Sequence, residues 1–142
     1  MAEDKEKSKK PLQVFISYAK EDKASVDELL KGLAAQHPNL RVFSSDQLSA
    51  GENWLPRLKR ELSKTDIFIV LLSPNSITSE LVLSLLGAAW ALSVPIIPIV
   101  TQQEIRSKLP VTLANVPVID MKKLDTPRVV SRMIERYETQ AA

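Results

Sequence analysis

The fold of this chain is decided by residues 66–90, which read DIFIVLLSPNSITSELVLSLLGAAW. The first seven residues are apolar nearly throughout, as in a central parallel strand that is covered on both faces. A short polar turn follows at 73–75, and residues 79–92 are rich in Leu and Ala, which favour a helix. A strand that leads directly into a helix in this way is typical of an α/β domain.

The same region contains a run that resembles a membrane span in length. Residues 81–100 carry no charged side chain, and twenty such residues are long enough to cross a bilayer. Pro95 and Pro98 interrupt the run, and its second half, residues 94–100, is rich in β-branched side chains. We therefore predict a buried helix followed by a buried strand rather than a membrane element.

Strand and helix signals alternate outward from this stretch. Apolar segments of strand length recur at 14–18, 40–43, 95–100 and, more weakly, 116–120. Apolar residues at helical spacing recur at 22–36, at 54–63 and from Thr126 onward. The alternation, without an internal repeat or linker, predicts one α/β domain with a parallel sheet and right-handed crossovers.

Composition limits the classes of function. The 142 residues are 44% hydrophobic and 25% charged, which suits one domain with a full core. The net charge of +2 gives no electrostatic case for a nucleic-acid partner. The chain has no cysteine, which excludes disulfides, thiolate nucleophiles and zinc–thiolate sites and fits a reducing compartment, so we expect a cytoplasmic protein.

Residues 1–10 alternate acidic and basic side chains and lack the apolar core of a signal peptide. We predict that they are a disordered, charged lead-in and that residues 11–142 form the single domain. His37, the one histidine, stands next to Pro38 in a predicted loop. We expect a solvated side chain there and no metal site, because metal ligands and Ser–His pairs both need partners at suitable spacing.

The carboxyl ends of the predicted strands are where a ligand is expected, because α/β sheets of this kind bind ligands outside those ends. The residues at these ends are Ser17-Tyr18-Ala19, Ser44-Ser45-Asp46 and Ser73-Pro74-Asn75.

Four segments, in this order along the chain, resemble the TIR (Toll/interleukin-1 receptor/resistance protein) domain family. Residues 15–18 resemble its first conserved box, and residues 46–54 resemble its BB loop with the start of the next helix. Residues 70–76 resemble the strand and turn before the family's catalytic helix, and 87–90 resemble a segment common in bacterial-type members. The resemblance implies a flavodoxin-like, five-stranded parallel sheet of order 2-1-3-4-5 with helices on both faces.

The resemblance also bears on catalysis. In NAD-cleaving members the helix reads roughly Ser-x-Trp-x-x-x-Glu, and the Glu is the catalytic carboxylate. Here Ser79 matches, but Leu81 replaces the Trp and Leu85 the Glu, while Ala19 stands where some of these members have a basic residue. Leucine cannot stabilise the positive charge that develops on the ribose, and the loss of such a group costs about 3–4 kcal/mol of barrier. We therefore predict a domain with little or no catalytic activity.

An NAD+ hydrolase or cyclase with a displaced carboxylate, or with a composite site across protomers, is the alternative. Glu80 and Asp46 are the fallback carboxylates, although Glu80 points about 140° away from position 85 of the helix. A pocket that binds NAD or an NAD-derived nucleotide without cleaving it is a third possibility, and no cofactor is required. The residues expected to contact such a ligand are Ser17, Tyr18, Ala19, Phe43, Trp54 and Ser79.

Many family members are signalling or immune proteins that assemble through the BB loop and neighbouring helices. The predicted helix at 81–92 is apolar almost all round, as expected for a helix that is enclosed in its domain or covered by another chain. The partners implied are other TIR domains, of the same or a different kind. The predicted interaction residues are Asp46, Gln47, Leu48, Ser49, Ala50, Gly51, Glu52, Leu81 and Leu85.

Overall fold

The structure, a computed structural model, describes residues 11–44, 54–123 and 125–141. Within these residues a five-stranded parallel sheet has the order β2-β1-β3-β4-β5. Its strands are β1 (Gln13–Ser17), β2 (Arg41–Ser44), β3 (Ile67–Leu72), β4 (Ile96–Val100) and β5 (Ile119–Asp120). The predicted α/β class and the strand order implied by the resemblance are therefore confirmed. The predicted lead-in, residues 1–10, lies outside the described residues.

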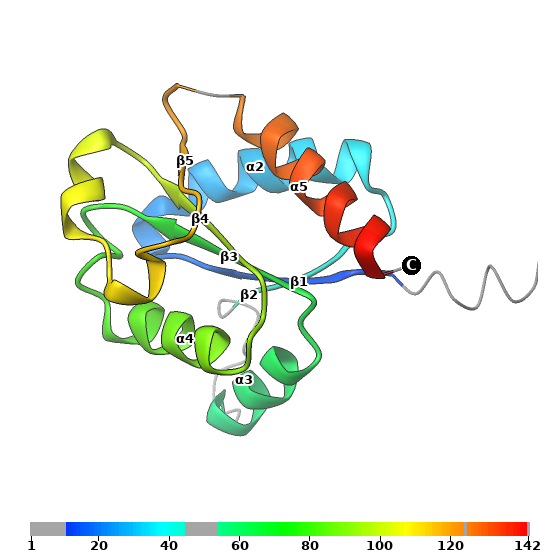
Figure 1. The fold of residues 1–142 in the computed structure, drawn as a ribbon, viewed down its shortest axis with the longest axis horizontal. Helices are drawn as coiled ribbons and strands as arrows, with labels where there is room; N and C mark the ends of the chain where they lie inside the picture. The colour runs from blue at the N-terminus through cyan, green and yellow to red at the C-terminus, as the bar shows by residue number, and fades with distance from the viewer. Residues whose placement is uncertain (1–10, 45–53, 124, 142) are drawn as a thin grey trace, which may run out of the picture.

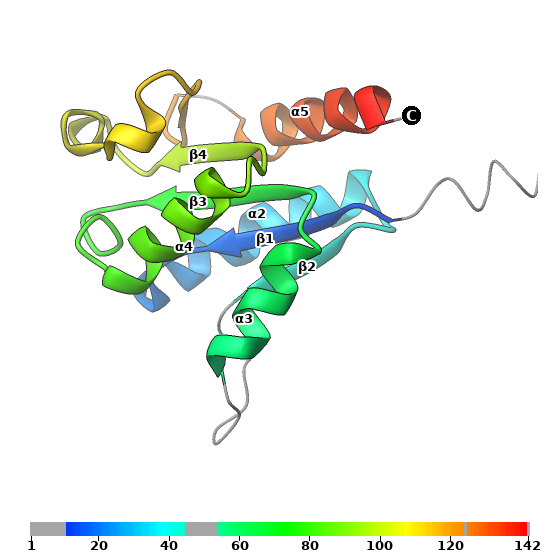
Figure 2. The ribbon, with the colours of Figure 1, turned by 60° about the horizontal axis from the view of Figure 1, so that its bottom comes forward.

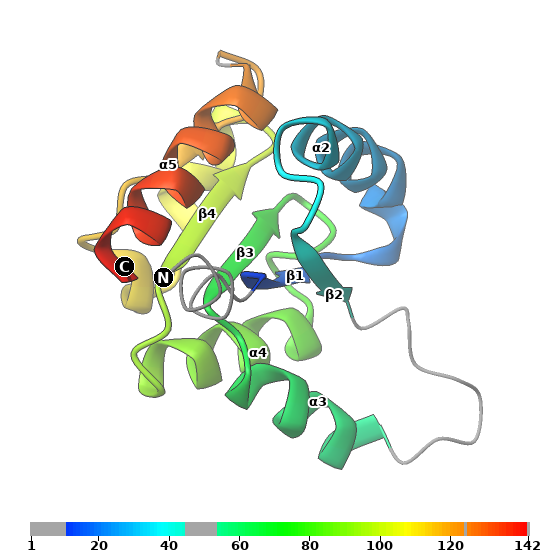
Figure 3. The same ribbon diagram turned by 90° about the vertical axis from the view of Figure 1, so that its right-hand side faces the viewer.

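Helices cover both faces of the sheet (Figures 1 and 3). Helices α2 (Lys23–Gln36) and α5 (Thr126–Ala141) pack together on one face, and α3 (Trp54–Ser63) and α4 (Glu80–Ala91) lie on the other. A short 3-10 helix, η1 (Lys20–Asp22), joins β1 to α2. Figure 2 shows β1, β3 and β4 pointing the same way, so their carboxyl ends share one edge of the sheet.

Strand β3 is the centre of the core, and all its side chains are fully buried. Alternate residues enter two separate apolar clusters, as the two-residue period of a strand requires. Phe68, Val70 and Leu72 join the cluster that includes residues of α3 and α4. Ile67, Ile69 and Leu71 join the cluster that includes residues of α2 and α5. The prediction of a central strand covered on both faces is confirmed.

The uncharged run at 81–100 forms a helix and then a strand, as predicted. Helix α4 ends at Ala91, and β4 begins at Ile96. Between them Ser93 has a φ of 58°, the left-handed conformation that commonly ends a helix. No helix in the described ranges is long and apolar enough to cross a membrane.

The connection from β4 to β5 differs from the other crossovers. It contains two 3-10 helices, η3 (Gln103–Lys108) and η4 (Val111–Leu113), which the apolar pattern did not predict. Strand β5 is shorter than the predicted 116–120, and it pairs with β4 only at Ile99 and Val100. Pro98 and Pro117 precede the paired residues and have no N–H to donate to a ladder, which explains the short pairing.

Helices α2 and α5 approach closely at Gly32. A Cβ placed on Gly32 would lie 2.6 Å from the Cβ of Pro127 in the first turn of α5. Real Cβ atoms do not approach so closely, and both atoms belong to stiff parts of the chain. Glycine is therefore required at this position for the two helices to pack as they do.

Gly32→Ala is expected to destabilise the fold by about 1–3 kcal/mol through overpacking, although alanine is the better helix former. Gly87→Ala in α4 is the matched control, because a Cβ there meets no described atom within 4 Å. The control should stabilise the protein by about 0.5–1 kcal/mol. Urea denaturation measures both free energies of unfolding, and stabilisation by both alanines would contradict the close helix contact.

Candidate functional site

The carboxyl edge of the sheet is where a ligand-binding site is expected in a fold of this kind. The chain leaves β1 at Ser17 and β3 at Leu72, and these two strands are neighbours. The connection after β1 runs to one face of the sheet and that after β3 to the other, which makes this the topological switch point. Ligands of open α/β sheets bind in the crevice at such a point.

The turn between β3 and α4 is held by serine hydroxyls. The backbone N–H groups of Asn75 and Ser76 both donate to the Ser73 Oγ at 3.1 Å. The Ser76 Oγ accepts from the Ser73 N–H at 2.8 Å and donates to the Leu71 carbonyl at 2.7 Å. Ser73 and Ser76 are buried, so these bonds fix the turn from inside.

Asp22 links this turn to the end of β1. Its Oδ2 accepts from the Ser73 Oγ at 2.5 Å, and its Oδ1 accepts from the Asn75 Nδ2 at 3.3 Å. Asp22 ends η1, which follows β1, so one carboxylate joins the connections after two neighbouring strands. Sequence reasoning treated Asp22 only as the start of a helix. The sequence does show an acidic residue shortly after the end of a strand. The hydrogen-bond partners of Asp22, however, lie 51 and 53 residues away in the sequence.

The predicted ligand residues on β1 and β2 are mostly buried. Ser17 is 1% exposed, and its Oγ has no hydrogen-bond partner among the described residues. Tyr18 and Ala19 follow it at 9% exposure each. Phe43 packs its ring edge-on against Phe15, with 5.2 Å between the ring centroids. The Ser17 hydroxyl is therefore a polar group at this strand end that a ligand could use.

The predicted ligand residues on the helices have different surroundings. Trp54 begins α3 and is half exposed. Arg57, one turn later, places its guanidinium carbon 5.3 Å from the centroid of the Phe43 ring, a cation–π geometry. Ser79 is the N-cap of α4, and its side chain accepts from the Val82 N–H at 3.3 Å. The hydroxyl of Ser79 thus stabilises the start of the helix.

The two leucines that the resemblance aligns with the family's Trp and Glu have different surroundings. Leu85 is 7% exposed and belongs to the apolar cluster on the α3–α4 face of the sheet. Leu81 is 39% exposed. Glu80, a fallback carboxylate, is exposed at the first position of α4, whereas Leu85 is buried, so the two side chains lie on different faces of the helix.

The BB-loop residues fall outside the described ranges: Asp46, Gln47, Leu48, Ser49, Ala50, Gly51 and Glu52. Their predicted role in interaction, and that of Asp46 as a fallback carboxylate, stay predictions. Among the described residues, no group of three or more His, Cys, Asp or Glu side chains is placed to hold a metal ion.

His37 does not have the solvated side chain that we expected, which corrects that prediction. The side chain is 11% exposed, its Nε2 lies 2.7 Å from the Ser131 Oγ, and its Nδ1 lies 3.6 Å from the Glu138 Oε1. Both partners belong to α5, whereas His37 caps the end of α2. A serine, a histidine and a carboxylate are the residue types of a nucleophilic triad, but Ser131 is 1% exposed inside the helix contact. The three residues therefore clamp α2 to α5.

Comparison with known proteins identifies the family. The family model for the TIR domain matches residues 14–134. A search of curated proteins finds no significant match. Solved structures of similar fold include the TIR domain of the Toll-related receptor TRR-2 from the lower metazoan Hydra magnipapillata. That structure has a TM-score of 0.68 and 22% identity, over 87% of this chain and 94% of that one.

Two further solved structures are similar in fold. The TIR domains of the activated Roq1 resistosome have a TM-score of 0.62 and 15% identity, over 88% of this chain and 98% of that one. A metazoan TIR-STING receptor from C. gigas has a TM-score of 0.62 and 16% identity, over 83% of this chain and 40% of that one. The family match over residues 14–134, together with the sheet order and these neighbours, shows that the chain belongs to the TIR domain family.

Proposed function

We propose that this chain is a TIR signalling module that works in the cytoplasm by associating with a second TIR domain, its own copy or a different one. In this proposal the chain does not cleave NAD by itself. The observation that carries the proposal is that the exposed residues of α4 after Glu80, its first residue, carry no charge. Surface helices normally present charged side chains to water.

The α4 outer face, as we use the term, consists of Leu81, Ser84, Ala91 and Leu92. All four residues are exposed, and Leu81 and Leu92 are 39% and 58% exposed. The leucines add apolar area, and Ser84 and Ala91 are small residues without charge. Exposed apolar surface of this kind marks a site of interaction with another protein.

The absence of catalysis is supported by the positions of three side chains. Leu85, at the position of the family's catalytic Glu, is buried and has no charge. Glu80 is exposed on a different side of α4. Both carboxylate oxygens of Asp22 accept hydrogen bonds from the β3–α4 turn, so this carboxylate has a structural role. Catalysis of NAD cleavage needs a carboxylate aimed at the developing charge.

Binding of NAD or an NAD-derived nucleotide without cleavage is a second candidate function. It is favoured by the Ser17 hydroxyl, which is buried at the switch point and has no partner among the residues that the structure describes. Buried polar groups are normally hydrogen-bonded, so such a hydroxyl is suited to a ligand.

Ala91→Arg is expected to weaken association at least tenfold, about 1.4 kcal/mol, because it would bury a charge in an apolar interface. Ala35→Arg is the matched control, since Ala35 is exposed on α2, on the opposite side of the sheet. Sedimentation velocity over a range of protein concentrations measures both. Association of Ala91→Arg that is as tight as in the wild type, or a wild type that stays monomeric throughout, would overturn self-association through α4.

Wild-type protein is expected to release no more nicotinamide from NAD than buffer alone, and Glu80→Gln is expected to behave in the same way. Leu85→Glu restores the family's carboxylate but places it in the core, so its free energy of unfolding should fall by about 2–5 kcal/mol. Chromatography measures nicotinamide, and urea denaturation measures stability. Calorimetry on the wild type shows whether NAD binds without turnover.

Release of nicotinamide by the wild type that Glu80→Gln or Asp46→Asn abolishes would establish the alternative, an NADase with a displaced carboxylate. Release that rises steeply with protein concentration would instead indicate a composite site between protomers. Leu85→Glu that is as stable as the wild type would show that position 85 faces water.

A further inference from the structure

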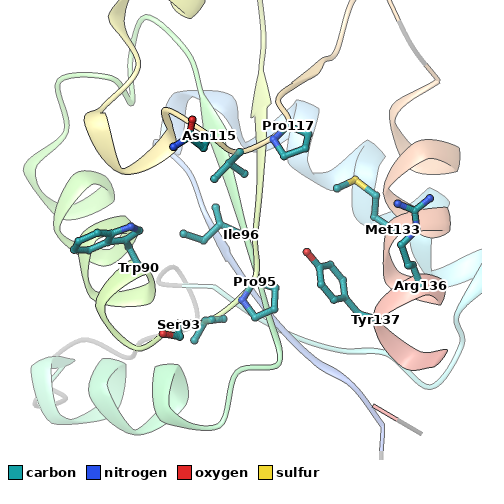
Figure 4. Close-up of a pocket in the computed structure, with 11 residues that line it drawn as sticks. Trp90, Ser93, Pro95, Ile96, Asn115, Pro117, Met133, Arg136 and Tyr137 are labelled. Atoms are coloured by element: carbon teal, nitrogen blue, oxygen red, sulfur yellow. The ribbon is translucent and has the colours of Figure 1, made fainter. Parts of the chain in front are cut away.

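A groove of about 620 Å³ lies at the amino edge of the sheet, away from the switch point (Figure 4). It is bordered by the end of α4, the start of β4, the segment before β5 and the second half of α5. The groove therefore shares no lining residue with the nucleotide site that the family resemblance implies. Its volume falls within the range of about 300–1,000 Å³ that is typical of small-molecule sites.

Two aromatic side chains are among the residues that line this groove. Trp90 at the end of α4 stands on one side, and Tyr137 and Met133 of α5 stand on the other (Figure 4). The Trp90 side chain is 58% exposed. This is high for tryptophan, whose large aromatic ring gains much free energy from burial. Pro95 and Ile96 lie between the walls, and Figure 4 shows the Tyr137 hydroxyl directed toward them. These side chains offer a planar ring apolar surface to contact.

The charge on the groove is positive. Arg136 is exposed, and it forms no ion pair with any residue in the described part of the chain. The described lining residues include no carboxylate, and Asn115 adds an exposed amide. A guanidinium that forms no ion pair within the protein can bind a ligand carboxylate through two parallel hydrogen bonds. The groove is therefore complementary to an anion.

We propose that this groove binds a small aromatic carboxylate, with its ring over Pro95 and Ile96 and its acid group at Arg136. Apolar side chains contact the ring, and polar groups orient it, as in other small-molecule sites. This proposal can stand or fail without the association proposed above, because it rests on different side chains: Trp90, Asn115, Arg136 and Tyr137.

The test uses 2-naphthoate as the probe and two-dimensional amide NMR of the whole chain. Saturable shifts are expected at 93, 94, 96, 115, 116 and 133–137, and the uncharged analogue 2-naphthamide should bind about tenfold more weakly. Arg136→Gln should weaken 2-naphthoate binding by a similar factor. Arg132→Gln, one turn earlier on α5, is the matched control, because Arg132 is exposed but does not line the groove. That variant should bind as the wild type does.

Trp90→Ala provides a second variant that is expected to fold, because the side chain is largely in water. It should also bind 2-naphthoate about tenfold more weakly, since it loses one wall of the groove. No saturable shift, or equal binding by Arg136→Gln and the wild type, overturns the proposal. Shifts centred on 17–19 and 73–76 overturn it as well, since they would place the probe at the switch point.

Discussion

The burial of β3 is the constraint on which the rest of this domain depends. Its six residues are apolar on both faces of the strand, and a sheet centred on them must be covered by helices on both sides. Phe68, Val70 and Leu72 require apolar partners from α3 and α4, and Ile67, Ile69 and Leu71 require them from α2 and α5. The three-layer arrangement is the result.

This requirement explains why position 85 is structural in this chain. Val82, Leu85, Leu86 and Ala89 are the buried residues of α4, and they join the same apolar cluster as alternate residues of β3. A leucine at position 85 gains about 1.5–3 kcal/mol from burial, which a carboxylate there would forfeit. The family resemblance aligns this position with the catalytic Glu of NAD-cleaving members, so by that alignment packing and NAD chemistry would compete for one side chain. In this sequence the residue at position 85 is a leucine that packs in the core.

Local sequence patterns predicted the strands and helices, but they could not predict contacts between residues far apart in the sequence. The apolar run 66–72 and the Leu- and Ala-rich helix after it were sufficient for β3 and α4. His37 was misjudged because Ser131 lies 94 residues away, and no pattern near either residue marks the pair. Asp22 was missed as the clamp on the β3–α4 turn for the same reason. The helices η3 and η4 are too short to show an apolar period.

Helix α4 connects the two regions to which we assign functions. Its outer face is the proposed contact with another TIR domain, and Trp90 near its end is a wall of the groove. A partner that covers Ala91 and Leu92 would come close to Trp90, which is adjacent in sequence. If both contact Trp90, a carboxylate in the groove and a partner on α4 change each other's affinity by the same factor, because binding linkage is reciprocal. If the ligand and the partner compete for Trp90, the ligand inhibits assembly. If both contact Trp90 at the same time, the ligand promotes assembly.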